Sequence, residues 1–206
     1  MPDSFFSEQN LELAQEIIGR YPKPRSAMIP LLHLAQEQAG WVSEPAMAQI
    51  AELVGTTSAE VLGTCSFYEM FKRHEVGKYV INICATMSCA LMGAGELLHH
   101  AEQRLGIKAG GTTSDGMFTI ESAECQAACT EAPCLQVNYR HKYRVSPADL
   151  DLLIDDLAAG KLESEVPVHG ILARTRQHIP ADRAVGAEAP ESVTTPPSWF
   201  AIEEAG

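Results

Sequence analysis

The sequence lacks any long apolar run and any cluster of basic residues. No apolar stretch approaches the roughly 18 residues that a membrane span requires, and the opening residues MPDSFF carry none of the basic charge that begins a secretory signal. Lys and Arg number 15 against 27 Asp and Glu, a formal net charge of -12. This balance makes nucleic acid and anionic membrane surfaces poor partners. We therefore expect a cytoplasmic chain without direct membrane insertion, whose partners are other proteins.

The sequence also lacks the motifs of nucleotide binding and of serine-based acyl transfer. It contains no G-x-G-x-x-G, no P-loop and no G-x-S-x-G. The short glycine runs Gly93–Gly95 and Gly110–Gly111 are typical of turns and helix entries. We expect no catalytic residues and no hydride-transfer or nucleotide-binding residues in this chain.

Cysteine is concentrated in one stretch, because five of the six cysteines lie between Cys84 and Cys134. Four of them form two short-range pairs, Cys84 with Cys89 and Cys125 with Cys129, separated by 35 residues. Two loops that each present two thiolates to one inorganic centre require this arrangement. The spacing favours an iron-sulfur cluster and leaves a zinc site, disulfides or a thiol redox pair as alternatives.

Each alternative meets an objection in the sequence. Zinc sites prefer tighter C-x2-C pairs or added histidines, and neither cysteine loop contains a histidine. Disulfides are rare in the cytoplasm. A thioredoxin-type oxidoreductase would place a C-x-x-C after the first strand, and this chain has none there.

Hydrophobic periodicity predicts two kinds of structure. Up to about residue 66, apolar residues recur at helical spacing, and a capping box formed by Thr57 and Glu60 opens the last of four helices. After Gly77 the pattern becomes strand-like, in the order β-α-β-β-β-α that fits a thioredoxin-like α/β sandwich. The predicted elements are helices at 7–19, 26–40, 43–55, 57–66, 93–105 and 146–159, and strands at 78–83, 117–122, 135–139 and 142–145.

Two further expectations concern the hairpin and the chain end. The hairpin is expected to turn near Arg140–His141. From Leu162 the periodicity fades among prolines, which predicts an extended tail whose aromatics, Trp199 and Phe200, are either loosely ordered or an anchor onto another subunit. The predicted division is therefore a small N-terminal helical bundle (1–66), an α/β domain (67–161) and the tail (162–206).

Several blocks of sequence carry a family resemblance. They are FYEMF at 67–71, VGKY at 76–79, Cys84-x4-Cys89, TSDG at 113–116, Glu124-Cys125-x3-Cys129 and Ala132-Pro133. Over about residues 10 to 160 the chain resembles the thioredoxin-like 2Fe-2S ferredoxin subunit, designated E, of respiratory NADH:quinone oxidoreductase (complex I). The same family includes diaphorase subunits of bidirectional hydrogenases and small subunits of NAD-dependent formate dehydrogenases.

The resemblance implies a ligand set, a cofactor and partners. It assigns Cys84, Cys89, Cys125 and Cys129 as the ligands of one 2Fe-2S cluster in an electron-carrying redox subunit. FMN and NAD would bind only to a neighbouring flavoprotein subunit, on which we expect the helical module to dock beside other peripheral-arm subunits. The complex would hold the chain on the cytoplasmic side of the inner membrane. A zinc-binding structural or assembly module is the alternative from another class.

The chain departs from the family pattern at three places. Gln126-Ala127 replaces a usual Leu-Gly pair, Glu75 stands where proline is frequent, and Cys134 stands where methionine is frequent. Because Pro133 precedes it and an alternating strand pattern follows, we interpret Cys134 as a packing residue at the start of a strand and not as a ligand.

Overall fold

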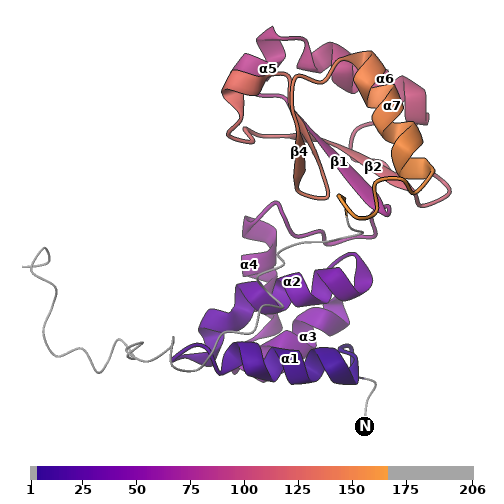
Figure 1. Ribbon diagram of the computed structural model, residues 1–206. Coiled ribbons are helices and arrows are strands. Elements are labelled where there is room, and N and C mark those ends of the chain that lie inside the picture. Colours follow the sequence, from indigo (N-terminus) through magenta and orange to yellow (C-terminus); the bar gives the residue numbers. More distant parts are fainter. Residues whose placement is uncertain (1–3, 167–206) are drawn as a thin grey trace, which may run out of the picture.

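The computed structural model describes residues 4–166, and its elements form two lobes (Figure 1). A lobe of helices contains α1 to α4, and a second lobe contains the sheet with α5, α6 and α7. The predicted fold class, a helical bundle followed by a thioredoxin-like α/β domain, is confirmed. Within residues 4–166, none of the helices has the length and apolarity needed to cross a membrane.

Side-chain caps fix the starts of three N-terminal helices. Ser7, Ser43 and Thr57 each accept a hydrogen bond from a backbone N–H of the first turn, and Thr57 forms the predicted capping box with Glu60. A short 3-10 turn precedes the second helix, which therefore starts two residues later than the sequence predicts. The elements are α1 (Glu8–Ile18), η1 (Pro24–Ala27), α2 (Met28–Ala39), α3 (Glu44–Val54) and α4 (Ser58–Phe67).

The helices bury one core and the sheet lobe another. The first core extends from Phe6 to Phe71. The packing of the helical lobe therefore continues past α4 into residues 68–78, the linker between α4 and β1. The second contains the inward residues of the strands together with those of α6 and α7. Each lobe therefore has an apolar interior of its own.

The sheet lobe follows the predicted order of strands and helices. Its strands lie in the order β2-β1-β3-β4, with β1 and β2 parallel and the other neighbours antiparallel. α5 and η2 are additional short elements in the two cysteine loops. The elements are β1 (Tyr79–Cys84), α5 (Met87–Leu91), α6 (Ala94–Leu105), β2 (Phe118–Ala123), η2 (Cys129–Glu131), β3 (Leu135–Val137), β4 (Arg140–Lys142) and α7 (Pro147–Ala158).

The hairpin turn lies two residues earlier than the sequence predicts. Asn138 and Tyr139 have positive φ angles of 43° and 65°, and Arg140 already pairs with Val137 across the ladder. Asn138 is tied to β1, because its side chain accepts from Val80 N–H and donates to the Lys78 carbonyl. The expected turn near Arg140–His141 is wrong because an asparagine in the left-handed region ends the strand early.

The two faces of the sheet differ in polarity. Tyr79, Ile81 and Ile83 point into the core, which also holds residues of α6 and α7, and these helices cover one face of the sheet (Figure 1). On the other face a polar row crosses all four strands in register. It consists of Glu121, Asn82, Gln136 and His141.

Polar contacts join the two lobes at this second face. Gln36 of α2 is buried, and its amide donates to the Met70 carbonyl at 2.9 Å and to the Tyr139 hydroxyl at 3.2 Å. Lys72 in the linker forms an ion pair with Glu121 of β2. These contacts hold the linker against the polar face of the sheet.

Part of the predicted tail is described. Residues 162–166 form a turn in which Val166 N–H donates to the Leu162 carbonyl at 2.7 Å, and Val166 is fully buried in the second core. Trp199 and Phe200 lie outside the described residues.

Candidate metal centre

Folding brings the two cysteine pairs to one edge of the sheet. Cys84 is the last residue of β1, and Cys89 lies in α5 directly after it. Cys125 and Cys129 lie in the loop that follows β2. Because β1 and β2 are adjacent and parallel, their carboxyl ends meet, with Cys84 opposite Ala123. The sequence could not show this adjacency, since 35 residues separate the pairs.

The two pairs differ in their exposure to solvent. Cys84 and Cys89 are each 2% exposed, whereas Cys125 and Cys129 are exposed. The Cys125 and Cys129 sulfurs lie 3.7 Å apart, and Ala127 N–H donates to the Cys125 sulfur at 3.4 Å. One pair is therefore built into the protein interior and the other lies at its surface.

Hydrogen bonds connect the loops and shift the thiol pKa values. Burial acts to raise the pKa of Cys84, but donors that include the backbone N–H groups of Thr86 and Gln126 outweigh it and leave the pKa below its usual value. The pKa of Cys129 is raised, chiefly by its hydrogen bond with Cys125 and by that group's negative charge, although the Ser88 hydroxyl acts in the opposite direction. Each loop thus supplies a donor to a sulfur of the other loop.

Cys134 lies directly before β3 and next to the first pair. It is 1% exposed, and its sulfur is 3.7 Å from that of Cys89. Burial, together with the neighbouring Cys89 and Cys84 thiols, raises the pKa of Cys134 to about 12. Its buried position agrees with the interpretation as a packing residue, but nothing in the sequence indicates that it contacts Cys89. That Cys134 is not a ligand of the cluster stays a prediction.

The second loop is held by residues that sequence reasoning did not select. The Gln126 amide donates to the Asn82 carbonyl of β1 at 2.9 Å, and its oxygen lies 3.8 Å from the Cys134 sulfur. The Gln126 carbonyl lies 3.1 Å from His141 Nε2, and the Gln136 amide nitrogen lies 2.9 Å from the same ring atom. In the sequence, only its departure from the family leucine drew attention to Gln126, and no feature indicated a role for His141.

Ala127 shows why a glycine is usual at its position. Its φ angle is 58°, in the left-handed region where a side chain is disfavoured. The loop therefore keeps its shape at a cost in backbone strain that glycine would avoid.

A cleft of about 750 Å³ lies beside the second loop. The linker residues Tyr68 to His74 line one side, and Asn82, Glu121 and Gln136 of the polar sheet face line the other, with Cys125 at its edge. Cys125 of the exposed pair thus borders the junction of the two lobes.

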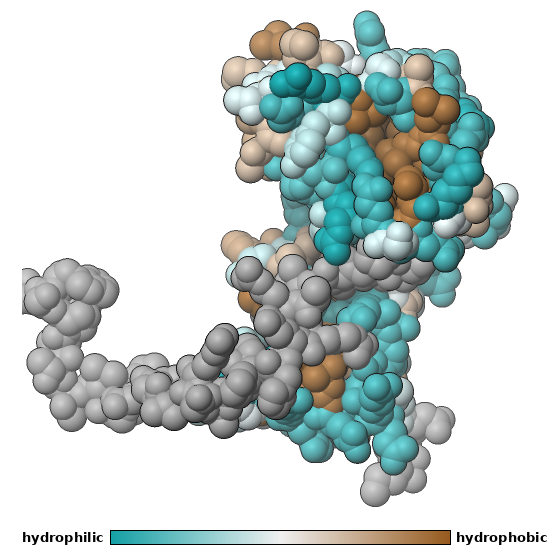
Figure 2. Space-filling view, viewed as in Figure 1, coloured by the Kyte–Doolittle hydropathy of each residue, from teal (hydrophilic) through white to brown (hydrophobic). Residues whose placement is uncertain are grey.

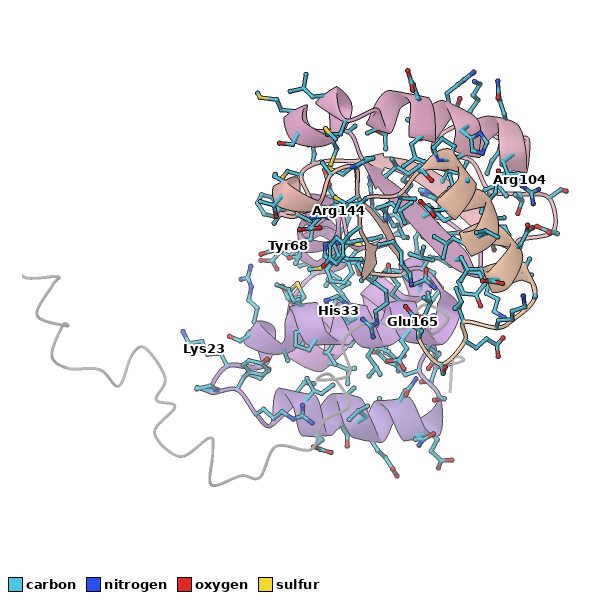
Figure 3. All side chains as sticks on the ribbon, turned by 45° about the horizontal axis from the view of Figure 1, so that its top comes forward. Lys23, His33, Tyr68, Arg104, Arg144 and Glu165 are labelled. Carbon is cyan, nitrogen blue, oxygen red and sulfur yellow. The ribbon has the colours of Figure 1, made fainter. Side chains whose placement is uncertain are left out.

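The donor set fits a thiolate-bound iron centre. Two thiolates on one tetrahedral ion with metal–sulfur bonds of about 2.3 Å lie about 3.8 Å apart, close to the 3.7 Å between Cys125 and Cys129. Neither loop contains an acidic or histidine side chain. Glu131, which follows the second loop, is paired with Arg144, whose Nε lies 2.8 Å from its carboxylate. Arg144 is labelled in Figure 3. The site is therefore rich in thiols and backbone donors, and neither loop contains a carboxylate or an imidazole that competes for a metal ion.

Comparison with known proteins defines the class of protein. The family model for thioredoxin-like [2Fe-2S] ferredoxins matches residues 14–158. This is most of the chain, and it includes all four predicted ligands. The chain belongs to the thioredoxin-like [2Fe-2S] ferredoxin family.

Similar individual proteins include subunits of NADH-quinone oxidoreductases. NADH-quinone oxidoreductase subunit 2 of Thermus thermophilus is 38% identical over 168 residues, which cover 80% of this chain and 93% of that protein. The NADH-quinone oxidoreductase subunit designated E in Mycobacterium bovis is 39% identical over 144 residues, 70% of this chain and 57% of that protein. The subunit of the same designation in Rickettsia felis is 38% identical over 154 residues, 73% of this chain and 92% of that protein.

The fold recurs in a larger solved structure. An NAD+-reducing [NiFe]-hydrogenase in the air-oxidized state matches with a TM-score of 0.61 and 21% identity, over 74% of this chain and 26% of that one. At this identity the likeness concerns the fold alone.

Proposed function

We propose that this chain is the electron-carrying subunit of an NADH:quinone oxidoreductase and binds one 2Fe-2S cluster through Cys84, Cys89, Cys125 and Cys129. The observation that carries the proposal is the meeting of the two cysteine loops at the carboxyl ends of β1 and β2. The family match and the NADH-quinone oxidoreductase relatives support it. A 2Fe-2S cluster, when bound, accepts and gives up one electron at a time.

The residues around the thiols favour negative charge at this site. Backbone N–H groups of Thr86 and Gln126 donate to the Cys84 sulfur, and the N–H of Ala127 donates to that of Cys125. Such donors stabilise thiolates and the extra electron of a reduced centre. The buried pair excludes water from one side, and the exposed pair offers a short route to the surface.

We infer that FMN and NADH bind to a flavoprotein partner and that this chain docks on it through the helical lobe. The lobe exposes apolar side chains at the end of α4, where Phe67 is 77% and Tyr68 37% exposed and their ring centroids lie 5.0 Å apart. Figure 2 shows hydrophobic residues beside α4 on a surface that is mostly hydrophilic. Exposed apolar groups that lie together are typical of protein interfaces. Together with other peripheral-arm subunits, this contact would hold the chain on the cytoplasmic side of the membrane.

We propose a division of the chain into a helical module (1–66), a 2Fe-2S domain (67–161) and a tail (162–206). The two separate cores support two folded modules, although Phe71 belongs to the first core and Val166 to the second. An equivalent diaphorase subunit of an NAD-linked hydrogenase or formate dehydrogenase is the alternative. Relatives at 38–39% identity are NADH-quinone oxidoreductase subunits, whereas the hydrogenase likeness stands at 21%. The first function is therefore the better supported.

Cofactor analysis tests the proposal. The purified chain is expected to contain about two iron and two acid-labile sulfide per molecule, with a red-brown colour that bleaches on dithionite. Stoichiometric zinc that persists, without sulfide, after anaerobic reconstitution with iron and sulfide would instead favour the structural zinc module and reject the electron-carrier function.

Co-purification tests the partner. Phe67→Asp is expected to reduce recovery of the flavoprotein subunit about tenfold, since a charge replaces an apolar contact. Leu152→Asp is the matched control, because Leu152 is 64% exposed on α7 in the other lobe. Equal recovery with both variants would show that α4 does not dock on the flavoprotein.

A further inference from the structure

Three buried cysteines form a group that differs from the four proposed cluster ligands. The sulfurs of Cys84, Cys89 and Cys134 all lie within 4.8 Å of one another, and each residue is at most 2% exposed. Their surroundings are small and apolar, with Ala94, Ala128 and Ala132 packed against them. The group is therefore a preformed set of three thiols in the protein interior.

Its dimensions suit one metal ion. Three sulfurs at about 2.3 Å from a single ion lie about 3.8 to 4.0 Å apart. The Cys89 and Cys134 sulfurs already lie 3.7 Å apart, and the third sulfur is within 4.8 Å of both. Rotations that move a sulfur by about 1 Å are enough to close the set. A disulfide between Cys89 and Cys134 would require about 2.05 Å, so these two thiols are not bridged.

The backbone holds the three residues in place from different elements. Cys84 N–H donates to the Cys134 carbonyl at 3.2 Å, which fixes the end of β1 against the residue that precedes β3. Cys89 lies on α5, whose first turn is closed by the Ala90 N–H bond to the Thr86 carbonyl at 3.1 Å. Ligands held in this way lose little freedom when an ion binds.

We propose that Cys84, Cys89 and Cys134 form a site for a single thiophilic metal ion, such as Zn²⁺, Cd²⁺ or Cu⁺, in the protein that carries no cluster. Thiolate ligands select this class of ion. Each thiol gives its proton to solvent as it binds, and the Gln126 side-chain oxygen, 3.8 Å from the Cys134 sulfur, can approach as a fourth ligand.

The site has a consequence for cluster assembly, which rests on the proposed function. Cys84 and Cys89 belong to both ligand sets, so the single ion and the cluster exclude each other. Cys134 completes the single-ion site, and methionine is frequent at this position in the family. Cys134→Met removes a thiolate while retaining an apolar side chain.

Cadmium binding to the reduced full-length apoprotein tests the site. The apoprotein is expected to bind one Cd²⁺, seen as a thiolate-to-metal charge-transfer absorption, and Cys134→Met is expected to weaken this binding at least about tenfold. Cys65→Ser, in the helical lobe, is the control, and its Cd²⁺ binding should be unchanged. Unchanged affinity in Cys134→Met, or a greater loss of affinity in Cys129→Ser than in Cys134→Met, would overturn the proposal.

A protection experiment on the unaltered chain does not depend on the folding of any variant. Alkylation rates read by mass spectrometry should be at least about tenfold lower at Cys84, Cys89 and Cys134 in the Cd²⁺-loaded protein than in the metal-free protein, and equal in the two states at Cys125 and Cys129. Protection of Cys125 and Cys129 with modification of Cys134 would show that Cd²⁺ uses the four cluster ligands and would reject the site. These outcomes are independent of the iron and sulfide content that tests the proposed function.

Discussion

The two cysteine loops reach the same end of the sheet by different structural means. The first continues directly from β1 into α5, and its thiols are 2% exposed. The second is an exposed segment between β2 and β3, and contacts of Gln126 with Asn82 and His141 hold it against the sheet. The first loop takes its shape from regular secondary structure, whereas the second takes its shape from tertiary hydrogen bonds.

The difference shows that position along the chain does not reveal which cysteines are accessible to solvent. Both loops follow a strand, and in the sequence they are equivalent pairs. Only the first is enclosed, because α5 and the Cys134 segment cover it. Four predictions test this contrast, in order of decreasing effect.

The largest expected effect is loss of the cluster from either loop. Cys89→Ser and Cys129→Ser should both lose or alter the 2Fe-2S EPR signal, since serine is a poor substitute for a thiolate bound to iron. Cys134→Ser should retain the signal, with a stability loss of about 1 kcal/mol. Low-temperature EPR and absorption spectra provide the measurement. A lost signal in Cys134→Ser with an intact one in Cys129→Ser would reassign the fourth ligand.

The second effect is a difference in thiol reactivity in the reduced apoprotein. Cys125 and Cys129 should be alkylated at least about tenfold faster than Cys84 and Cys89, because reagents reach exposed thiols first. This order should hold although the pKa of Cys84 is lowered, since the thiol is buried. Time-resolved mass spectrometry with iodoacetamide measures it, and Cys65, buried in the helical lobe, serves as an internal reference. Equal rates would contradict the enclosed first loop.

The third effect concerns the strand that carries the first loop. Gly77 is buried beside β2, and a Cβ there would lie 2.8 Å from backbone atoms of Phe118. Gly77→Ala should therefore lower the free energy of unfolding by about 1–3 kcal/mol. Gly63→Ala in α4 is the control, because no atom lies within 4 Å of its added Cβ. Urea unfolding of both variants is the measurement, and equal stability would show that β1 tolerates displacement.

The smallest effect should arise in the second loop. Ala127→Gly should raise stability by about 1 kcal/mol or less, because glycine adopts the φ angle of 58° without strain but has more freedom when unfolded. The measurement is chemical unfolding of the apoprotein, with Ala85→Gly in the first loop as the control. A greater gain in stability from Ala85→Gly than from Ala127→Gly would show that the backbone strain lies in the first loop and not in the second.

The sequence by itself determined the local structure and the ligand candidates. Ser7, Ser43, Thr57 and the period of apolar residues set the helices, because caps and periodicity act over a few neighbouring residues. The spacing within each cysteine pair and the family blocks around it, which are local features too, indicated the ligand candidates. The predicted hairpin turn is misplaced because Asn138 adopts its left-handed conformation with hydrogen bonds to Val80 and Lys78. The local sequence pattern around the hairpin gives no information about these distant partners.

Tertiary structure alone decided which thiols are enclosed and which residues hold the second loop. Cys134 meets Cys89 from 45 residues away, and His141 meets Gln126 only after β3 and β4 pair. Such contacts form when parallel strands align their carboxyl ends and a hairpin folds back across the sheet. Their energies depend on distances between residues remote in the chain, and no local preference of the sequence encodes those distances.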